Sequence, residues 1–159
     1  MKKIAIFTML FFCFAVTICQ AASNNEFALG GITLGMSKNA VKNIYGEPKQ
    51  LEDKNNRDIC MYGDSFVLHF FDGYVTSMEI DDNNGVKMPA GFTVGSDLRE
   101  LVKYFGQNYG LSPDYREYDD MYYADFLYFY PDKSAVILQV GYDDDKICYI
   151  RIQATGIST

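Results

Sequence analysis

One pattern of apolar and polar positions occurs twice along the chain. Residues 31–48 read GITLGMSKNAVKNIYGEP, and residues 91–107, sixty positions later, read GFTVGSDLRELVKYFGQ. In both segments a short extended entry is followed by apolar residues one helical turn apart on a single face. The pattern predicts helices near residues 38–45 and 98–105.

The ends of both predicted helices carry residues that favour helix termini. Ser37 and Asp97 stand at the expected N-caps, where a side-chain oxygen accepts a free backbone N–H. Gly46 and Gly106 stand at the expected C-terminal ends, and Pro48 prevents continuation of the first helix. These five positions set the expected limits of the two helices.

Three strand-like runs follow each predicted helix. The first set is DICMYG, SFVLHFF and YVTSMEI, with the turn pair Asp72-Gly73 between the last two runs. Asp-Gly between two such runs is a strong hairpin signal. The second set is FLYFY, AVILQVGY and ICYIRIQ. The last runs of the two sets match in phase, and their expected core-facing residues are Thr76, Met78, Ile80, Cys148, Ile150 and Ile152.

The sequence therefore predicts an α+β fold of two tandem α-β-β-β units, in which antiparallel β-meanders have the helices packed on one face. The first unit is expected at residues 23–85 and the second at residues 86–159, joined by the polar connector DDNNGVKMPAG. One unit of this size would bury only about 60% of its unfolded surface, so the two are expected to share a sheet or a core.

Residues 1–22 have the features of a signal peptide. Two lysines precede an uncharged apolar run at residues 4–18, and small residues follow at positions 21–22. We expect cleavage there and an exported protein, periplasmic or extracellular. The alternative is a lipoprotein signal with Cys19 acylated, although Ile18 stands where that processing prefers a small residue.

The expected mature chain is strongly acidic. Removing the two lysines of the signal changes the net charge from −7 to −9. Such a chain has no basic footprint for nucleic acid and would be repelled by anionic lipid, and no second hydrophobic span follows the signal. The charge would favour another exported or envelope protein with a basic surface as partner, or would only keep the protein soluble.

Two cysteines, Cys60 and Cys148, remain after removal of the signal, one in each half of the chain. An oxidising compartment permits a disulfide between them. Two thiols buried on strand faces would give the same sequence pattern, so both alternatives stay open at this point.

No catalytic centre or cofactor site is recognisable in the sequence. His69 is the only histidine, and serine or cysteine catalysis would need it as the base. Patterns typical of hydrolases, zinc proteases, phosphate-binding loops and dinucleotide-binding folds do not occur. We therefore expect a protein that is not an enzyme and has no cofactor.

Clustered carboxylates support a second hypothesis, a small-ligand-binding or hydrolytic protein. Acidic residues gather at positions 81–85, 117–120 and 143–145. Such groups suit calcium binding or carboxylate-based hydrolysis. The spacing does not fit an EF-hand loop, because Ile80 stands where its first ligand is needed. We predict no metal ligands.

The most distinctive segment, residues 108–130, is rich in tyrosine and acidic residues. Tyrosine offers rigid contact area with a polar tip and is enriched at interfaces. Acidic neighbours would attract a basic partner. The predicted binding residues are Tyr109, Tyr115, Tyr118, Asp119, Asp120, Tyr122 and Tyr123.

The repeated segment also resembles a known family motif. Its first copy fits the pattern I-x-L-G-M-[ST]-x-x-x-V-x-x-x-x-G-x-P through Ile32, Leu34, Gly35, Met36, Ser37, Val41, Gly46 and Pro48. The second copy lacks the proline but has Val94, Gly95, Leu101 and Gly106. This motif with a following β-meander resembles the SmpA/OmlA (BamE-like) envelope domain, and two such units in tandem resemble β-lactamase-inhibitory protein and its relatives.

The resemblance implies a module that binds another protein, in an inhibitor-like or an envelope-assembly-like role. Two departures from the family pattern limit what it implies. A good lipobox is missing, which weakens the assembly role, and no inhibitory loop is matched residue by residue. The combined expectation is an exported, non-enzymatic protein-binding module that uses an aromatic, acidic sheet or loop face.

Overall fold

A computed structural model describes residues 26–54, 56–132 and 134–155 of the chain. The expected signal peptide and the alternative lipidation of Cys19 lie outside the described residues. Strand takes up 49% of the described residues and helix 16%, so the protein is mostly β.

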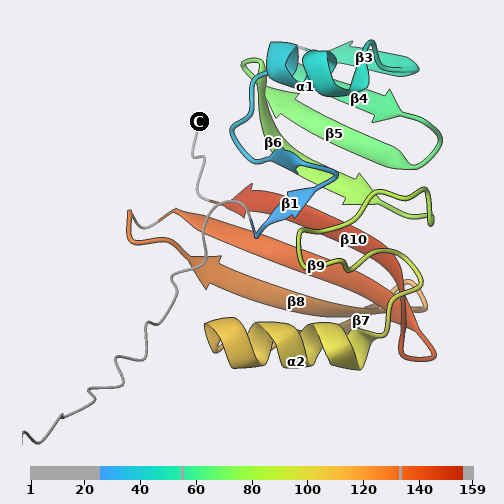
Figure 1. The fold of residues 1–159 in the computed structure, drawn as a ribbon, viewed down its shortest axis with the longest axis vertical. Coiled ribbons are helices and arrows are strands. Elements are labelled where there is room, and N and C mark those ends of the chain that lie inside the picture. Colours follow the sequence, from blue (N-terminus) through green and yellow to red (C-terminus); the bar gives the residue numbers. More distant parts are fainter. Residues whose placement is uncertain (1–25, 55, 133, 156–159) are drawn as a thin grey trace, which may run out of the picture.

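Twelve elements follow one another in the described part of the chain (Figure 1). The first half contains β1 (Ala28–Leu29), β2 (Ile32–Thr33), α1 (Lys38–Tyr45), β3 (Gln50–Lys54), β4 (Arg57–Tyr62), β5 (Phe66–Phe71) and β6 (Tyr74–Ile80). The second half contains α2 (Leu98–Tyr109), β7 (Asp114–Tyr118), β8 (Met121–Phe129), β9 (Ala135–Asp143) and β10 (Lys146–Thr155).

Eight of the strands form one antiparallel sheet in the order β3-β4-β5-β6-β10-β9-β8-β7, while β1 and β2 pair separately. The first half of the chain supplies β3 to β6 and the second half supplies β7 to β10. The halves join where β6 pairs with β10, from the partners Ser77 and Gln153 to the partners Ile80 and Ile150. This central pair makes a single sheet from the two units.

Both units use the same backbone hydrogen bonds to place their helices. The N–H of Gly35 donates to the carbonyl of Val75 at 2.8 Å, and the N–H of Gly95 donates to the carbonyl of Ile147 at 2.7 Å. In each unit a second bond runs back from that strand residue to the residue after the glycine. The segment before each helix is thus fixed to the start of the unit's last strand, so the sequence repeat corresponds to a repeat of contacts.

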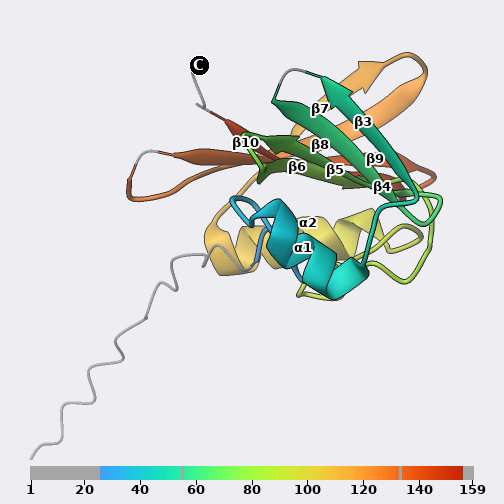
Figure 2. The same ribbon diagram turned by 90° about the horizontal axis from the view of Figure 1, so that it is seen from above.

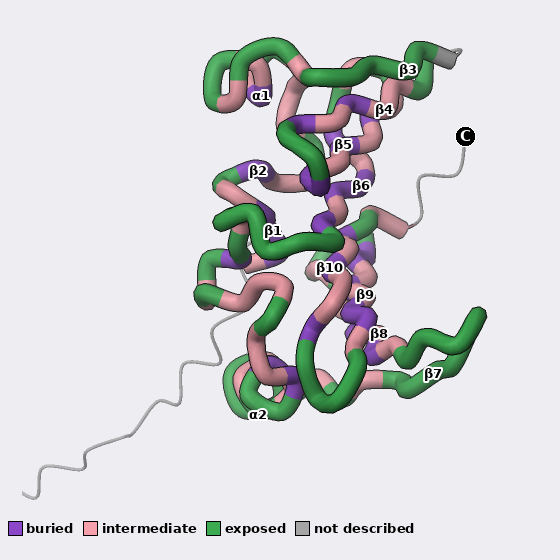
Figure 3. The backbone as a smooth tube through the Cα atoms, turned by 90° about the vertical axis from the view of Figure 1, so that its right-hand side faces the viewer, coloured by how far each residue is buried: buried purple, intermediate pink, exposed green. Residues whose placement is uncertain are grey.

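The expected α+β class with helices packed on one face is wrong. The two helices contain 8 and 12 residues, and they stand against a sheet of eight strands. The layer over the sheet is not helical throughout, because β1 and β2 lie between α1 and α2 on that side (Figure 3). Together with the connector, this intervening chain buries Phe27, Leu29, Ile32 and Met88. Non-helical backbone therefore supplies much of the covering layer.

The expected α-β-β-β unit is also wrong, because each unit has a fourth strand. The extra strands are β3 and β7, at the two edges of the sheet. Their sequences, QLEDK and DYREY, contain few apolar residues, and every residue of β7 is exposed. An edge strand with water on both faces needs no apolar alternation, and natural edge strands are often charged. The hydrophobic pattern therefore did not reveal them.

The helices begin where the sequence predicts, and one ends later. α1 spans the predicted residues 38–45 with Ser37 as its N-cap. α2 begins at the predicted residue but continues to Tyr109, so Gly106 does not end it. Gly110 ends it in the left-handed conformation, with its N–H bonded to the carbonyl of Gly106. The glycine that matches Gly46 in the repeat is an interior helix residue.

Two β-bulges change the expected set of core-facing residues. Thr76 in β6 and Cys148 in β10 are extra residues at register shifts, and both stay partly exposed. The preceding residues, Val75 and Ile147, occupy the core instead. A bulge places two residues opposite one and re-aims the side chains around it. The other four predicted residues are buried as expected, namely Met78, Ile80, Ile150 and Ile152.

The core lies between the sheet and its covering layer. Its largest fully buried side chains include Phe27, Phe66, Phe70, Phe105 and Phe126. The ring of Phe105 on α2 lies 5.8 Å from that of Phe27 and 5.5 Å from that of Phe126, which ties the N-terminal segment to β8 through the helix. Neither helix in the described ranges is long and apolar enough to cross a membrane.

Two neighbouring glycines offer a test of this packing. Gly30 and Gly31 both have positive φ, at 57° and 81°. A Cβ on Gly31 would meet nothing within 4 Å, whereas a Cβ on Gly30 would collide with the hydroxyl of Tyr45. That hydroxyl donates to the carbonyl of Gly30 at 2.8 Å. We expect Gly31→Ala to cost about 1–2 kcal/mol of unfolding free energy from backbone strain, and Gly30→Ala to cost about 1 kcal/mol more.

Urea unfolding of both variants measures the difference, and Tyr45→Phe is the control background. Without the hydroxyl, most of the extra cost of Gly30→Ala should disappear, because the next contact of the added Cβ, with Cγ1 of Val86, is at 3.2 Å. Equal costs for Gly30→Ala and Gly31→Ala in the wild-type background would contradict the contact.

Candidate functional site

The side of the eight-stranded sheet that faces away from the helices, the open face, has no covering layer in the described structure (Figure 2). The outer strands β3 and β7 project away from the helices, so this face is concave (Figure 3). Directly opposed residues of neighbouring strands share a face. One row of such residues crosses all eight strands of the open face: Gln50, Met61, Val67, Glu79, Arg151, Gln139, Asp125 and Asp114.

Glu79 is the centre of a polar network at the middle of this row. One carboxylate oxygen lies 3.0 Å from Nε2 of His69, and the other accepts the hydroxyl of Tyr149 at 2.6 Å. Nε of Arg151 lies 3.7 Å from the same carboxylate and donates to Oγ of Ser77 at 3.2 Å. Three strands contribute to the network, so its side chains hold one another in place across the joint between the units.

The environment of Glu79 acts on its pKa in two directions. Burial is the largest influence and raises the pKa of the carboxyl, while the bonds from His69 and Tyr149 lower it. The bonds win, and the pKa of Glu79 lies below its ordinary value. Burial and the bond to Glu79 raise the pKa of Tyr149, so the phenol stays protonated as a donor. The network is therefore built around an ionised carboxylate.

Two hollows of the open face lie beside the Glu79 network. One, of about 600 Å³, is lined by residues that include Ile59, His69 and Gln153. The other, of about 410 Å³, is lined by Arg116, Tyr118, Tyr123, Gln139, Tyr149 and Arg151. Arg151 lines both of them. The open face is thus hollowed on each side of a fixed polar centre.

A glycine makes room for the rings of the smaller hollow. A Cβ on Gly141 would lie 3.0 Å from Cβ of Tyr149 and 3.4 Å from the ring of Tyr123. Both tyrosines pair with Gly141 across the sheet, one from each neighbouring strand. The missing side chain leaves room for the side chains of both neighbouring strands.

The β7–β8 hairpin holds most of the predicted binding residues, and it divides them between its two sides. Tyr118 and Tyr123 lie on the open face, where both line the smaller hollow. Tyr115 and Tyr122 lie on the other side, where both rings contact Tyr142 of β9. The alternation of side chains along a strand requires this division. The tyrosine-rich segment therefore presents two surfaces rather than one.

Tyr109 lies apart from the hairpin. It is the last residue of α2, and its ring packs 5.6 Å from Phe105 and 6.0 Å from Tyr104. Burial, the largest influence, raises the pKa of its phenol. Its contacts make Tyr109 part of the packing around the helix end, and the structure does not bring it together with the other predicted tyrosines.

Asp119 and Asp120 form the turn of the β7–β8 hairpin, both with positive φ. The β9–β10 turn repeats this arrangement with Asp144 and Asp145, also at positive φ. Because Tyr122 near the start of β8 pairs with Tyr142 near the end of β9, the two turns lie at the same end of the sheet. Two of the acidic clusters in the sequence thus meet at one end of the sheet.

Cys60 and Cys148 are both free thiols. Cys60 is fully buried in β4, and Cys148 is partly exposed in the bulge of β10. Two strands, β5 and β6, separate the strands that carry them, and neighbouring strands stand about 4.8 Å apart. A disulfide needs Cα atoms within about 7 Å, so the two are not bridged in this fold.

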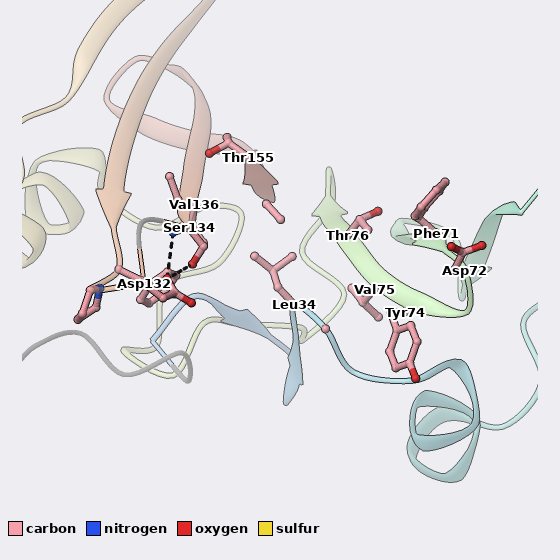
Figure 4. Close-up of a pocket in the computed structure, with 15 residues that line it drawn as sticks. Leu34, Phe71, Asp72, Tyr74, Val75, Thr76, Asp132, Ser134, Val136 and Thr155 are labelled. Carbon is pink, nitrogen blue, oxygen red and sulfur yellow. Dashed lines mark hydrogen bonds between the residues drawn. The ribbon is translucent and has the colours of Figure 1, made fainter. Parts of the chain in front are cut away.

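The largest of the hollows described for this fold, of about 1040 Å³, lies between the start of β6 and the end of β10 (Figure 4). Its walls include Leu34, Val75 and Val136. Asp132 also lines it, but this carboxylate accepts the N–H and the hydroxyl of Ser134 at 2.9 and 2.6 Å within its own turn. None of the tyrosines or acids predicted as binding residues lines this hollow.

The acidic clusters of the sequence do not converge on any of the four hollows described for this fold. No carboxylate of residues 81–85, 117–120 or 143–145 lines any of these four hollows, and only Asn84 and Tyr118 of these segments do so, in two different hollows. Within residues 26–54, 56–132 and 134–155, no three potential ligand side chains lie close enough together to hold a metal ion.

Sequence reasoning missed the central residues of the open face. Glu79, Tyr149 and Arg151 stand at outward positions of YVTSMEI and ICYIRIQ, where they resemble ordinary solvent-facing residues. The apolar–polar alternation in these runs could have shown that the three side chains point away from the core. Only the pairing of β6 with β10 brings Glu79 opposite Arg151, and the sequence pattern did not specify that pairing.

Comparison of the chain with protein-family models, curated proteins and solved structures finds no match. The resemblance to the SmpA/OmlA domain and to β-lactamase-inhibitory protein therefore stays a prediction from the motif.

The charge state of Glu79 gives a pH-dependent prediction. Its pKa is lowered in the folded state, so its ionised form contributes stability above the unfolded-state pKa of about 4.3, and this contribution is lost as the pH falls through the folded-state value. We expect Glu79→Gln to lower the unfolding free energy by about 1–3 kcal/mol at pH 7. The gap to the wild type should narrow below about pH 5.

Urea unfolding at a series of pH values from neutral to acid measures this gap. Glu117→Gln is the control, because Glu117 is exposed and has no ion pair within the described part of the chain. It should change the unfolding free energy by no more than about 0.5 kcal/mol. A Glu79→Gln gap that stays constant as the solution is acidified would contradict an ionised network.

Proposed function

We propose that the chain is an exported, non-enzymatic module that binds another protein through the open face and the β7–β8 hairpin. The observation that carries this proposal is the open face itself, a concave surface across eight strands with a polar centre already held in place by Glu79. A preorganised surface loses less conformational entropy on binding than one whose side chains must first be ordered.

Large side chains around this centre provide anchors for a partner. Tyr118 is 70% exposed, Phe129 is 64% exposed and Leu127 is 46% exposed. All three stand at open-face positions of β7 and β8. Exposed aromatic and aliphatic groups on one surface are typical of protein-binding sites, where a few such anchors contribute most of the affinity.

The second hypothesis, a small-ligand or hydrolytic protein, has less support. It requires the clustered carboxylates to meet in a recess, but they lie on turns, near strand ends and on the connector. The hollow of about 1040 Å³ is mostly apolar, and of the two carboxylates that line it, Asp72 and Asp132, the second is already bonded by Ser134. A broad concave sheet suits a protein surface better than it suits a small molecule, which needs enclosure on most sides.

The expected signal peptide and the net charge indicate the kind of partner. An exported chain meets envelope or extracellular proteins, and a charge of −9 after removal of the signal favours one with a basic surface. Inhibition of an exported enzyme and envelope assembly are both compatible with such contact, in line with the motif resemblance.

The test is capture of a partner with the exported chain as bait, in extracts of the cell envelope and the medium. A reproducible protein partner is expected. Tyr118→Ala should then weaken binding by about 1–2 kcal/mol, because it removes an open-face anchor. The melting temperature should barely change, since the side chain is mostly exposed.

Ile44→Ala is the matched control. Ile44 is 55% exposed on α1, on the other side of the sheet. It should leave affinity unchanged. Capture of no protein while a sugar or peptide binds would favour the second hypothesis, and equal losses for Tyr118→Ala and Ile44→Ala would move the contact surface away from the open face.

A further inference from the structure

Three tyrosine rings form a cluster on the helix side of the β7–β8 hairpin. The ring centres of Tyr122 and Tyr142 lie 5.9 Å apart, and those of Tyr115 and Tyr142 lie 6.4 Å apart. Tyr115 and Tyr122 are 56% and 47% exposed. These three residues, the tyrosine cluster, belong to three neighbouring strands and present ring surface to water.

Carboxylates surround the tyrosine cluster. Glu117 is the direct cross-strand partner of Tyr122 on the same face, and Tyr122 is the direct partner of Tyr142. Asp145 is close enough to help raise the pKa of Tyr142, after burial and the two other tyrosines. Glu117 lies two positions after Tyr115 along β7, so their side chains also share this face.

The charges at this end of the sheet are unbalanced. Three cations of the described residues near this end are already engaged: Arg99 with Asp97 and Asp145, Lys146 with Asp97, and Arg116 with Asp125. Within the ranges that the structure describes, five neighbouring carboxylates have no ion pair, namely those of Glu117, Asp119, Asp120, Asp143 and Asp144. The negative potential around the rings is therefore not cancelled from within the described chain.

We propose that the tyrosine cluster is a docking site for a cationic side chain, lysine or arginine, of the partner protein. The face of an aromatic ring carries negative electrostatic potential and attracts an ammonium or guanidinium group within about 6 Å of its centre. Glu117 and the two acidic turns add attraction of the same sign. An acidic or purely apolar group would gain nothing from these carboxylates.

The site deepens the proposed function, on which its biological role rests. The β7–β8 hairpin carries open-face anchors on one side and the cation site on the other. A partner that binds around the edge strand β7 therefore contacts both surfaces. Specificity then comes from two chemistries, apolar anchoring by Tyr118 and charge recognition by the tyrosine cluster.

The test does not depend on the natural partner. The exported chain is titrated with a capped peptide of alternating glycine and lysine, and the tyrosine ring signals are followed by NMR. The lysine peptide should shift the signals of Tyr115, Tyr122 and Tyr142, whereas the same peptide with acetylated lysines should not. An arginine version should bind at the same rings.

Substitutions at Tyr122 distinguish the contribution of the aromatic ring from that of apolar volume alone. Tyr122→Phe keeps the ring and should keep binding, while Tyr122→Leu removes it and should weaken binding by about two- to fivefold. Tyr74→Leu, which removes an exposed tyrosine at the start of β6 and outside the cluster, is the matched control and should have no effect on peptide binding. Melting temperatures show whether each variant is still folded. The NMR shifts of the wild type test the site without any substitution.

Equal binding of the lysine and acetyl-lysine peptides, or an unchanged affinity of Tyr122→Leu, would overturn the cation site. Partner capture together with either result would leave the proposed function standing. Conversely, specific lysine binding at the cluster without any captured protein would count against the proposed function and for the site.

Discussion

The pairing of β6 with β10 is the interaction on which the rest of the structure depends. Each unit ends in a strand whose outer edge would otherwise stand unpaired beside a small core. Pairing these two strands closes both edges and aligns Met78 and Ile80 with Ile152 and Ile150 in one core. The same pairing places Glu79 opposite Arg151. A continuous core and a continuous open face are therefore two results of one contact.

Local signals in the sequence were sufficient for the start of each helix and for the inner strands. Ser37 and Asp97 act as caps, and the alternation in FVLHFF correctly separates the buried Phe66, Leu68 and Phe70 from the outward His69. The edge strands β3 and β7 could not be predicted from the sequence, because exposed edge strands carry no apolar alternation. The end of α2 was misjudged because Gly106 packs within the helix and Gly110 supplies the left-handed cap.

The candidate site was predictable only in part, for a related reason. Composition pointed to the tyrosine-rich segment, and the structure does place Tyr115, Tyr118, Tyr122 and Tyr123 on one hairpin. Composition does not indicate which side of a strand a residue occupies when the register of that strand is unknown. The Glu79 network depends on a contact between residues about seventy positions apart, and such long-range pairings leave no local trace in a single sequence.

The paired aspartates of the β7–β8 and β9–β10 turns have a further consequence for the response to ionic strength. Asp119, Asp120, Asp144 and Asp145 hold like charges at one end of the sheet, in a conformation that costs a non-glycine residue about 1 kcal/mol. Among the four, only Asp145 has an ion-pair partner within the described residues, Arg99. Dissolved salt screens repulsion between exposed charges over roughly 10 Å and so relieves these turns. The same salt weakens the attraction of Arg151 for Glu79, although less, because that pair is partly buried. Added salt therefore stabilises the two acidic turns and weakens the Glu79 network at the centre of the same sheet.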